Sequence, residues 1–131
     1  MTNGPSDPNL EHLKLIQAVI MRLAGNSFLL KGWSVTLVAG LAALTKTQGD
    51  RSFAWIALGV VAVFWFLDSY YLALERAYRD LYRDVVAGTA ENWTLKATVP
   101  PDGIVKAAGS IAVVPLHGAV ALGAIIVGLS A

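Results

Sequence analysis

The feature that most constrains this chain is one helical run, residues 53–86, that is apolar first and charged afterwards. As a helix, the apolar part (residues 53–71) would measure roughly 30 Å, about the hydrocarbon thickness of a bilayer. No glycine or proline separates it from the charged part, residues 72–86. We interpret the run as one long helix, half in lipid and half in water.

A heptad stripe passes through both parts of this helix, with members spaced alternately by four and three residues. They are Val60, Phe64, Leu67, Tyr71, Leu74, Tyr78, Leu81 and Val85. The N-terminal part of the chain carries a second stripe of the same spacing. Its members are Leu13, Ile16, Ile20, Leu23, Ser27, Leu30, Ser34, Leu37, Leu41 and Leu44. We expect the two helices to pack along these stripes.

The N-terminal part divides into a disordered tail at 1–9, an amphipathic helix at 10–26 and a first span at 27–44. Asp7-Pro8 is a typical helix start. A short polar loop leads to the second span, so the spans form an antiparallel hairpin. The flanking helices 10–26 and 72–86 then emerge on one side as a two-helix stalk. A hinge at Gly25-Asn26, laying the first helix on the membrane, is the alternative.

A loop at 87–103, with Gly88 as helix cap and a Pro-Pro-Asp-Gly turn, precedes a third predicted span at 104–129. Pro115 is expected to kink that span or to open a backbone carbonyl within it.

The composition favours a single all-α domain in a membrane. Of 131 residues, 56% are hydrophobic and 15% charged, whereas soluble domains carry about 25% charged residues. The predicted fold class is an all-α integral membrane protein with three transmembrane helices and a cytoplasmic antiparallel helical stalk. Lys and Arg are more frequent beside the stalk than in the loop at 45–52, which predicts a cytoplasmic N-terminus in a bacterial inner membrane.

Three polar residues lie within the predicted spans: Lys31, Asp68 and His117. An ionisable group in a span is costly and should be paired or face an aqueous cavity, so we expect an Asp68–Lys31 ion pair. An ion or proton site at Asp68 is the functional alternative. His117 can hydrogen-bond Ser34 or Thr36 on a neighbouring helix, or it can titrate, gate or bind a ligand. A pore constriction from His117 would require several copies of the chain.

Small residues recur at four-residue spacing in the first and third spans, a pattern that lets helix backbones approach closely in a bilayer. The predicted helix-packing residues are Gly32, Thr36, Gly40, Gly123 and Gly128. Their faces can contact another subunit or the chain's own second span, and the intrachain contact is the simpler expectation.

The charged helix after Asp68 is either a solvated face or a docking surface for a cytosolic partner. The docking residues would be Arg76, Tyr78, Arg79, Tyr82 and Arg83. Nothing in the sequence indicates catalytic, cofactor-binding or metal-binding residues, since no zinc-protease, nucleotide-binding or Ser/His/Asp motif appears and there are no cysteines. We therefore expect no enzyme and no cofactor. The net charge of +1, without a block of like charge, argues against a nucleic-acid partner.

Several short motifs within residues 10–86 carry a resemblance. They are Asn26-Ser27-Phe28, Lys31-Gly32-Trp33, Phe64-Trp65, Leu67-Asp68, Tyr70-Tyr71-Leu72, Glu75-Arg76, Tyr78-Arg79 and Leu81-Tyr82. This pattern resembles a widespread family of small bacterial inner-membrane proteins of unassigned function. The layout is similar, more faintly, to the two-span SLATT effector modules of bacterial conflict systems, which are thought to assemble in the membrane and perforate it.

Two functions remain open from the sequence. The first is a homo-oligomeric pore or channel-like assembly, with an effector role implied by the second resemblance. The alternative is an accessory or assembly subunit of a larger membrane complex. The expected partners are the lipid bilayer, further copies of the chain and, for the alternative, other membrane-complex subunits. A transporter subunit is a third option that no internal repeat supports.

Overall fold

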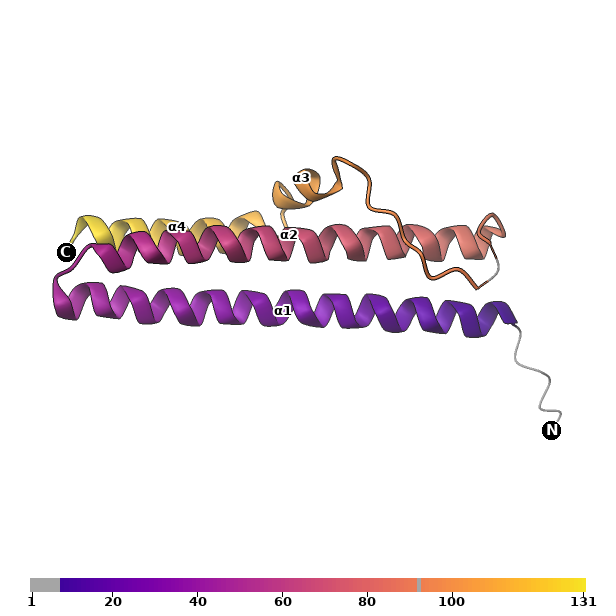
Figure 1. Cartoon of the computed structure of the whole chain (residues 1–131), viewed down its shortest axis with the longest axis horizontal. Coiled ribbons are helices and arrows are strands. Elements are labelled where there is room, and N and C mark those ends of the chain that lie inside the picture. Colours follow the sequence, from indigo (N-terminus) through magenta and orange to yellow (C-terminus); the bar gives the residue numbers. More distant parts are fainter. Residues whose placement is uncertain (1–7, 92) are drawn as a thin grey trace, which may run out of the picture.

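The computed structural model describes residues 8–91 and 93–131 as an all-helical chain (Figure 1). Its elements are α1 (Pro8–Gln48), α2 (Ser52–Ala87), α3 (Gly103–Ala108) and α4 (Val114–Leu129). Most of the predicted disordered tail lies outside the described residues, and its last two residues already belong to α1. By length and composition, α1 and α2 are each able to cross a membrane.

Helices α1 and α2 form a long antiparallel hairpin (Figure 1). The turn between them uses Gly49 with a positive φ of 65°, and the Asp50 carboxylate accepts a 2.8 Å hydrogen bond from the first amide of α2. Helix α1 runs through Gly25-Asn26 without a break, so the hinged alternative is wrong. Gly88 ends α2 in the left-handed conformation, as its sequence position predicts.

The prediction of a single third helix at 104–129 is wrong. Helix α3 stops at Ala108, a turn follows, and α4 begins at Val114. Pro115 lies in the first turn of α4 rather than at a kink. A proline inside a longer helix would clash with the carbonyl of Ile111, whereas the first turn needs no amide from it. The 16 residues of α4 measure roughly 24 Å, shorter than a full hydrocarbon core.

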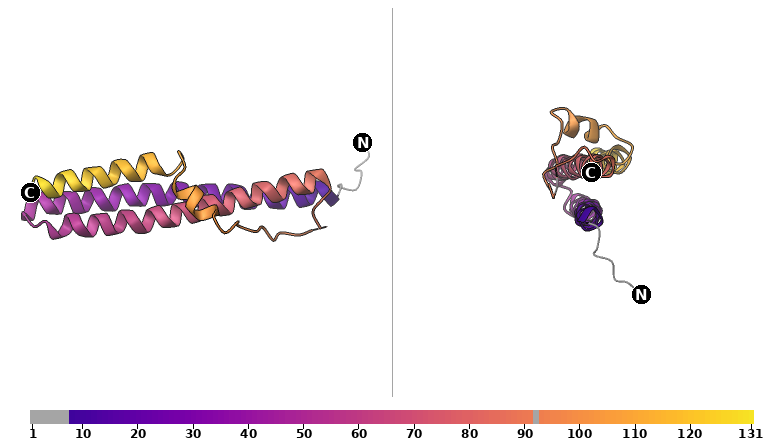
Figure 2. Two further views of the ribbon diagram at one scale, coloured as in Figure 1. Left: turned by 90° about the horizontal axis from the view of Figure 1, so that it is seen from above. Right: turned by 90° about the vertical axis from the view of Figure 1, so that its right-hand side faces the viewer.

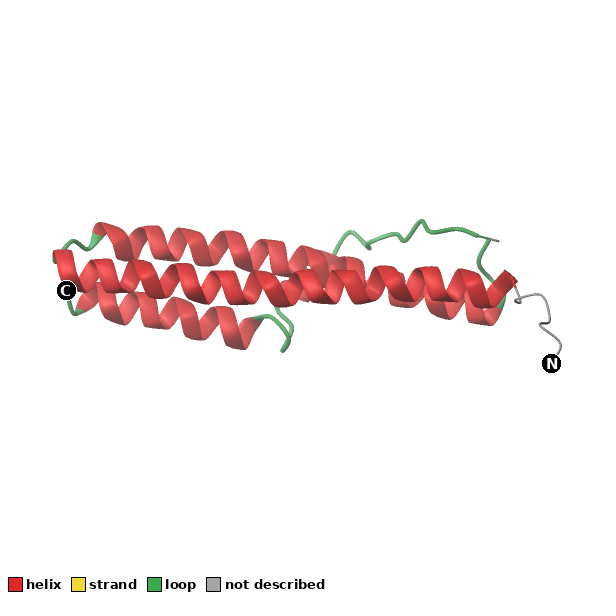
Figure 3. Cartoon of the chain, turned by 90° about the horizontal axis from the view of Figure 1, so that it is seen from below, coloured by secondary structure: helices red, strands yellow, loops and turns green. Residues whose placement is uncertain are grey.

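The hairpin has two different halves. In the apolar half, residues 27–71, α4 lies beside α1 and α2 as a third helix (Figures 2 and 3). In the charged half, residues 8–26 and 72–87, the two long helices pack without α4, and the short α3 lies against α2 near the junction of the halves. A strap (residues 88–91 and 93–102) runs along the charged half and returns the chain toward its middle (Figure 2).

Each half has a separate core. The charged half buries Ile16 and Ile20 of α1 against Leu81 and Val85 of α2, all four of them members of the predicted stripes. The core of the apolar half has smaller side chains and lies between α1, α2 and α4. It consists of Val38, Ala57, Val61 and Ala124.

The predicted α1 stripe is confirmed at Ser34, which is buried, but it is wrong at two positions beyond it. Leu37 and Leu44 are 42% and 41% exposed, while their neighbours Val38 and Thr45 are buried. A straight α-helix drifts by about 20° per heptad relative to a 3.5-residue repeat, so a strict stripe rotates out of the interface over several heptads. Helix α4 also packs against α1 in this half, so the buried face of α1 differs from the one that the stripe predicts.

Candidate functional site

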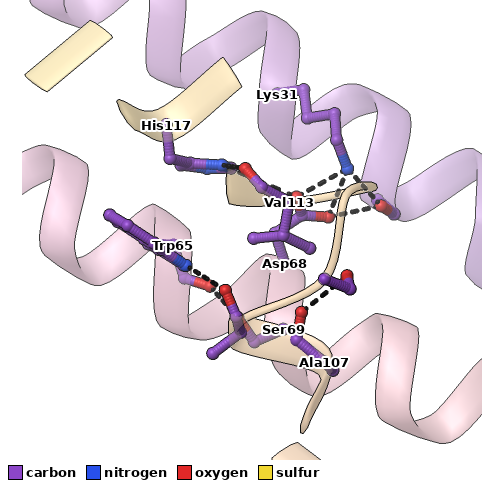
Figure 4. Close-up of polar contacts among 10 residues, drawn as sticks. Lys31, Trp65, Asp68, Ser69, Ala107, Val113 and His117 are labelled. Carbon is purple, nitrogen blue, oxygen red and sulfur yellow. Dashed lines mark hydrogen bonds and ion pairs between the residues drawn. The ribbon is translucent and has the colours of Figure 1, made fainter. Parts of the chain in front are cut away.

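The predicted ion pair between Asp68 of α2 and Lys31 of α1 is present (Figure 4). The Lys31 Nζ lies 2.5 Å from Asp68 Oδ2 and 2.7 Å from Oδ1. Ser27, one turn before Lys31, donates its hydroxyl to Asp68 Oδ1 and accepts a 2.9 Å bond from Lys31 Nζ. The Asp68 side chain is fully buried, and the Lys31 side chain is 25% exposed. The lysine therefore reaches the carboxylate from the edge of the bundle.

His117 of α4 completes this cluster from the third side (Figure 4). Its Nδ1 lies 3.1 Å from the Val113 carbonyl oxygen and 3.8 Å from Asp68 Oδ2. A carbonyl only accepts, so Nδ1 carries the proton and, in the neutral ring, Nε2 is the unprotonated nitrogen. Nε2 is buried and has no hydrogen-bond partner among residues 8–91 and 93–131. One buried acceptor is thus left beside the ion pair.

The expected partners of His117 on α1 are not used. Thr36 donates its hydroxyl to the Gly32 carbonyl of its own helix. The Ser34 hydroxyl is buried and, within the described part of the chain, unpaired. The His117 side chain turns instead toward α2 and toward the start of its own helix. There the Val113 carbonyl accepts a 3.4 Å hydrogen bond from the His117 amide, and this long bond leaves it able to accept a second one from the ring.

Trp65 of α2 is a member of the site that the sequence analysis missed. Its ring stacks on His117 with centroids 6.0 Å apart, and its Nε1 donates a 3.0 Å bond to the Ala108 carbonyl at the end of α3. Ser69 donates to the Trp65 carbonyl at 2.6 Å. Trp65 lies one turn before Asp68, and this spacing was the signal that could have placed the two residues on one face.

The cluster holds balanced charge. An ionised Asp68 and an ionised Lys31 sum to zero, and the His117 ring lies beside them as a third polar group. Such a buried pair costs desolvation, so removal of one partner leaves an uncompensated charge. Among the described residues, no group of three potential metal ligands is present.

The small-residue faces behave differently from one another. A side-chain carbon added at Gly32, Gly40 or Gly123 would meet nothing within 4 Å, so these faces are open. The intrachain contact expected for the first span is therefore wrong. Gly128 does pack within the chain, because an added carbon there would lie only 2.8 Å from the Ala54 side chain of α2.

The predicted docking residues remain on the surface of the charged half, with their charges partly paired. Arg79 binds Glu75 at 2.5 Å and Arg83 binds Asp80 at 2.6 Å, while Arg76 is exposed.

The two tyrosines of this set are less accessible. The Tyr78 hydroxyl donates to the Leu95 carbonyl of the strap at 3.1 Å. Tyr82 packs against the core of the charged half and lines a groove with Gln17, Ile20 and both paired arginines. Tyr78 is therefore not a free anchor, whereas Tyr82 borders an open groove.

His12 has a structural role that the sequence did not reveal. It is buried under the strap, where its Nε2 lies 2.5 Å from the Thr94 carbonyl and its ring stacks on Trp93 at 5.8 Å. His12 belongs to the charged half and His117 to the apolar half, so the two histidines serve separate contacts.

Comparison with known proteins gives no match to a family model, a curated protein or a solved structure. The resemblances carried by the hairpin motifs therefore stay predictions. Any function has to be argued from the arrangement of this chain's own residues.

Proposed function

We propose that this chain is a polytopic membrane protein whose copies assemble side by side into a channel-like homo-oligomer. The observation that carries the proposal is the open small-residue face of α1. Gly32 and Gly40 have empty space above them, and Thr36 between them is exposed. Small residues at this spacing favour close helix approach in a bilayer, and no other helix of the described chain occupies the face.

The membrane setting is supported by the outward placement of large apolar side chains in the apolar half. Phe28, Trp33 and Trp55 are 76%, 60% and 72% exposed, and Phe66 and Ile56 are more than half exposed. An apolar surface of this extent would aggregate in water, whereas lipid tails solvate it. The excess of Lys and Arg beside the charged half favours placing it on the cytoplasmic side of a bacterial inner membrane.

A channel requires several copies, because the interior of one chain is closed. The buried ion pair is balanced and packed between α1, α2 and α4, so it lines no open path through a single copy. In the proposal, this cluster locks the three helices of each subunit together, and the conduit forms between subunits.

The first test is the mass of the assembly in mild detergent, measured by native mass spectrometry. Leucine at Gly32 and Gly40 together should reduce the oligomer to smaller species, because the bulky side chains separate the helices. Leucine at Gly59 of α2, which is also exposed with nothing within 4 Å, is the matched control and should leave the oligomer intact. A wild-type chain that is monomeric at all concentrations would refute the proposal.

The second test is ion conductance in planar bilayers. Wild-type protein should give discrete current steps that the paired leucine variant of Gly32 and Gly40 lacks. An intact oligomer that conducts nothing would reduce the proposal to self-association without a pore.

An accessory subunit of a larger membrane complex is a second candidate, favoured by one specific observation. The groove lined by Gln17, Ile20, Tyr82 and the arginines Arg79 and Arg83 lies on the charged half, where an acidic partner segment would compete with Glu75 and Asp80 for the two guanidinium groups. Extraction from native membranes in a fixed ratio to other polypeptides would favour this function. A ring containing only copies of this chain would exclude it.

A further inference from the structure

An apolar groove opens at the end of the apolar half where the α1–α2 turn and the end of α4 meet. Its walls are Leu58 of α2 and Ile125 of α4, and its floor is the close contact of Ala54 with Gly128. The volume is about 340 Å³, within the usual range of roughly 300–1,000 Å³ for small-molecule sites. The groove is therefore large enough for a section of an extended hydrocarbon chain.

The rim of this groove carries a guanidinium and an indole. Arg51 is the only charged residue among those that line the groove. Its Nε and Nη2 donate to the backbone oxygen of Ala131 at 3.3 and 3.1 Å, which holds the guanidinium at the rim, and the guanidinium carries further N–H donors. Trp55, which is 72% exposed, stands beside it as a residue that prefers the membrane interface.

A second cation and one carboxylate complete the charge at this end. Lys46 of α1 donates to the Ser130 hydroxyl at 2.6 Å. The Asp50 carboxylate accepts a hydrogen bond from the Ser52 amide at the start of α2, which lowers its pKa and keeps it ionised. Two cations thus converge at the end of α4, while the one acidic residue of the turn is held by the helix start.

We propose that this groove binds an anionic phospholipid, with one acyl chain between α2 and α4 and the phosphate on Arg51. The inference rests on the membrane placement in the proposed function. A guanidinium forms paired hydrogen bonds with a phosphate, and an apolar trough directly below it holds the attached chain. A groove of similar kind between α2 and α3, lined by Ala62, Phe66 and Val105 among others, has no cation and serves as an internal comparison.

The test is native mass spectrometry of delipidated protein titrated with phosphatidylglycerol or phosphatidylcholine of identical acyl chains. Wild-type protein should prefer phosphatidylglycerol, and Arg51→Gln should weaken its binding by about tenfold, as expected for one charge-assisted contact. Arg51→Lys should weaken binding less than Arg51→Gln, because the positive charge remains while the paired donors are lost. Arg79→Gln, which removes a guanidinium from the charged half, is the matched control and should change nothing. Ile125→Trp, which fills the groove, should weaken both lipids.

Several results would overturn the lipid site. These are equal binding of the two lipids, loss of binding in the Arg79→Gln control, or an Ile125→Trp variant that loses oligomers while the wild type carries no lipid. The last result would assign the groove to a second copy of the chain.

Alkaline extraction of membranes separates the two proposals. A chain that stays in the membrane without lipid preference refutes only the lipid site, whereas release of the chain from the membrane refutes the membrane placement as well. Thermal melts of each variant exclude unfolding as the cause.

Discussion

The apolar half and the charged half of this molecule place large and small side chains in opposite positions. The charged half buries large aliphatic residues such as Ile16 and Leu81 and exposes most of its charges, with Glu75 as a buried exception. The apolar half buries alanines, serines and the Asp68 cluster, and it exposes aromatic residues such as Phe28 and Trp55. The same two helices therefore bury different kinds of side chain in their two halves.

The difference is the one that the proposed placement predicts, with the charged half in water and the apolar half in lipid. In water, burial of aliphatic surface stabilises a helix pair by about 25 cal/mol per Å². In lipid that gain disappears, so helices associate through close contact of small residues and through polar pairs. The contact of Gly128 with Ala54 and the Lys31–Asp68 pair are both of the second kind. The packing of the two halves thus supports the membrane placement proposed above.

The sharpest test of this comparison is the ion pair of the apolar half. Lys31→Met leaves the buried Asp68 carboxylate without its cation, and we expect a loss of about 3–5 kcal/mol in stability. The measurement is thermal or denaturant unfolding in detergent. The double variant Lys31→Met/Asp68→Leu should recover most of the loss, since no charge is then left buried.

The matched control for that experiment is the exposed pair of the charged half, Lys14 with Glu11 at 2.9 Å. Lys14→Met should cost no more than about 1 kcal/mol, because a solvated ion pair contributes little. An unchanged melting temperature in Lys31→Met would contradict the role assigned to the buried pair.

The aliphatic core of the charged half should produce the next largest effect. Ile16→Ala removes a fully buried side chain and should cost about 2–3 kcal/mol, because it leaves a cavity between α1 and α2. Phe28→Ala removes a larger side chain from the surface of the apolar half and should change the free energy of unfolding in detergent far less. Equal losses in the two variants would show that the halves do not follow different packing rules.

A smaller effect is expected from the close helix contact of the apolar half. Gly128→Ala places a methyl group 2.8 Å from the Ala54 side chain, so α4 must shift, at a cost of about 1–2 kcal/mol. Gly123→Ala, on the open face of the same helix, should be neutral or slightly stabilising because alanine has the higher helix propensity. Thermal unfolding of both variants under the same conditions tests whether only the Gly128 position is closely packed.

The smallest effect concerns the segment between the halves. The Lys106 side chain, which hydrogen-bonds the Asp102 carboxylate at the start of α3, holds the Asp102 pKa below its ordinary value of 3.8. A lowered pKa means that this contact supports α3 above pH 3.8 and is lost as the pH falls below it. Amide hydrogen exchange of residues 103–108 should therefore accelerate on acidification. Asp102→Asn should remove the pH dependence attributable to this pair, and an unaltered acid profile would contradict the assignment.

The sequence was sufficient for the parts of the fold that depend on local signals. The hairpin follows from the polar loop before Ser52, the end of α2 from Gly88, and the ion pair from the matching depths of Lys31 and Asp68 on antiparallel helices. The core of the charged half also follows from its stripe, because two helices packed in water need only one seam.

The remaining parts depend on where α4 packs, which no local pattern specifies. The stripe prediction failed at Leu37 and Leu44 because a third helix redefines the buried face of α1. The contact of Trp65 with His117 brings together residues far apart in the chain. His12 was missed for the same reason, since its partner Thr94 lies in a strap without regular structure.

The order in which the chain is synthesised has a consequence for the buried cluster. Lys31 and Asp68 belong to the first two helices, so their ion pair can form as soon as the hairpin exists. His117 belongs to α4, which is synthesised after the hairpin and after the strap. Until that helix docks, the carboxylate has an open side through which water and protons can reach it. A segment made after the hairpin therefore closes the site, and a chain truncated before α4 should carry an accessible Asp68.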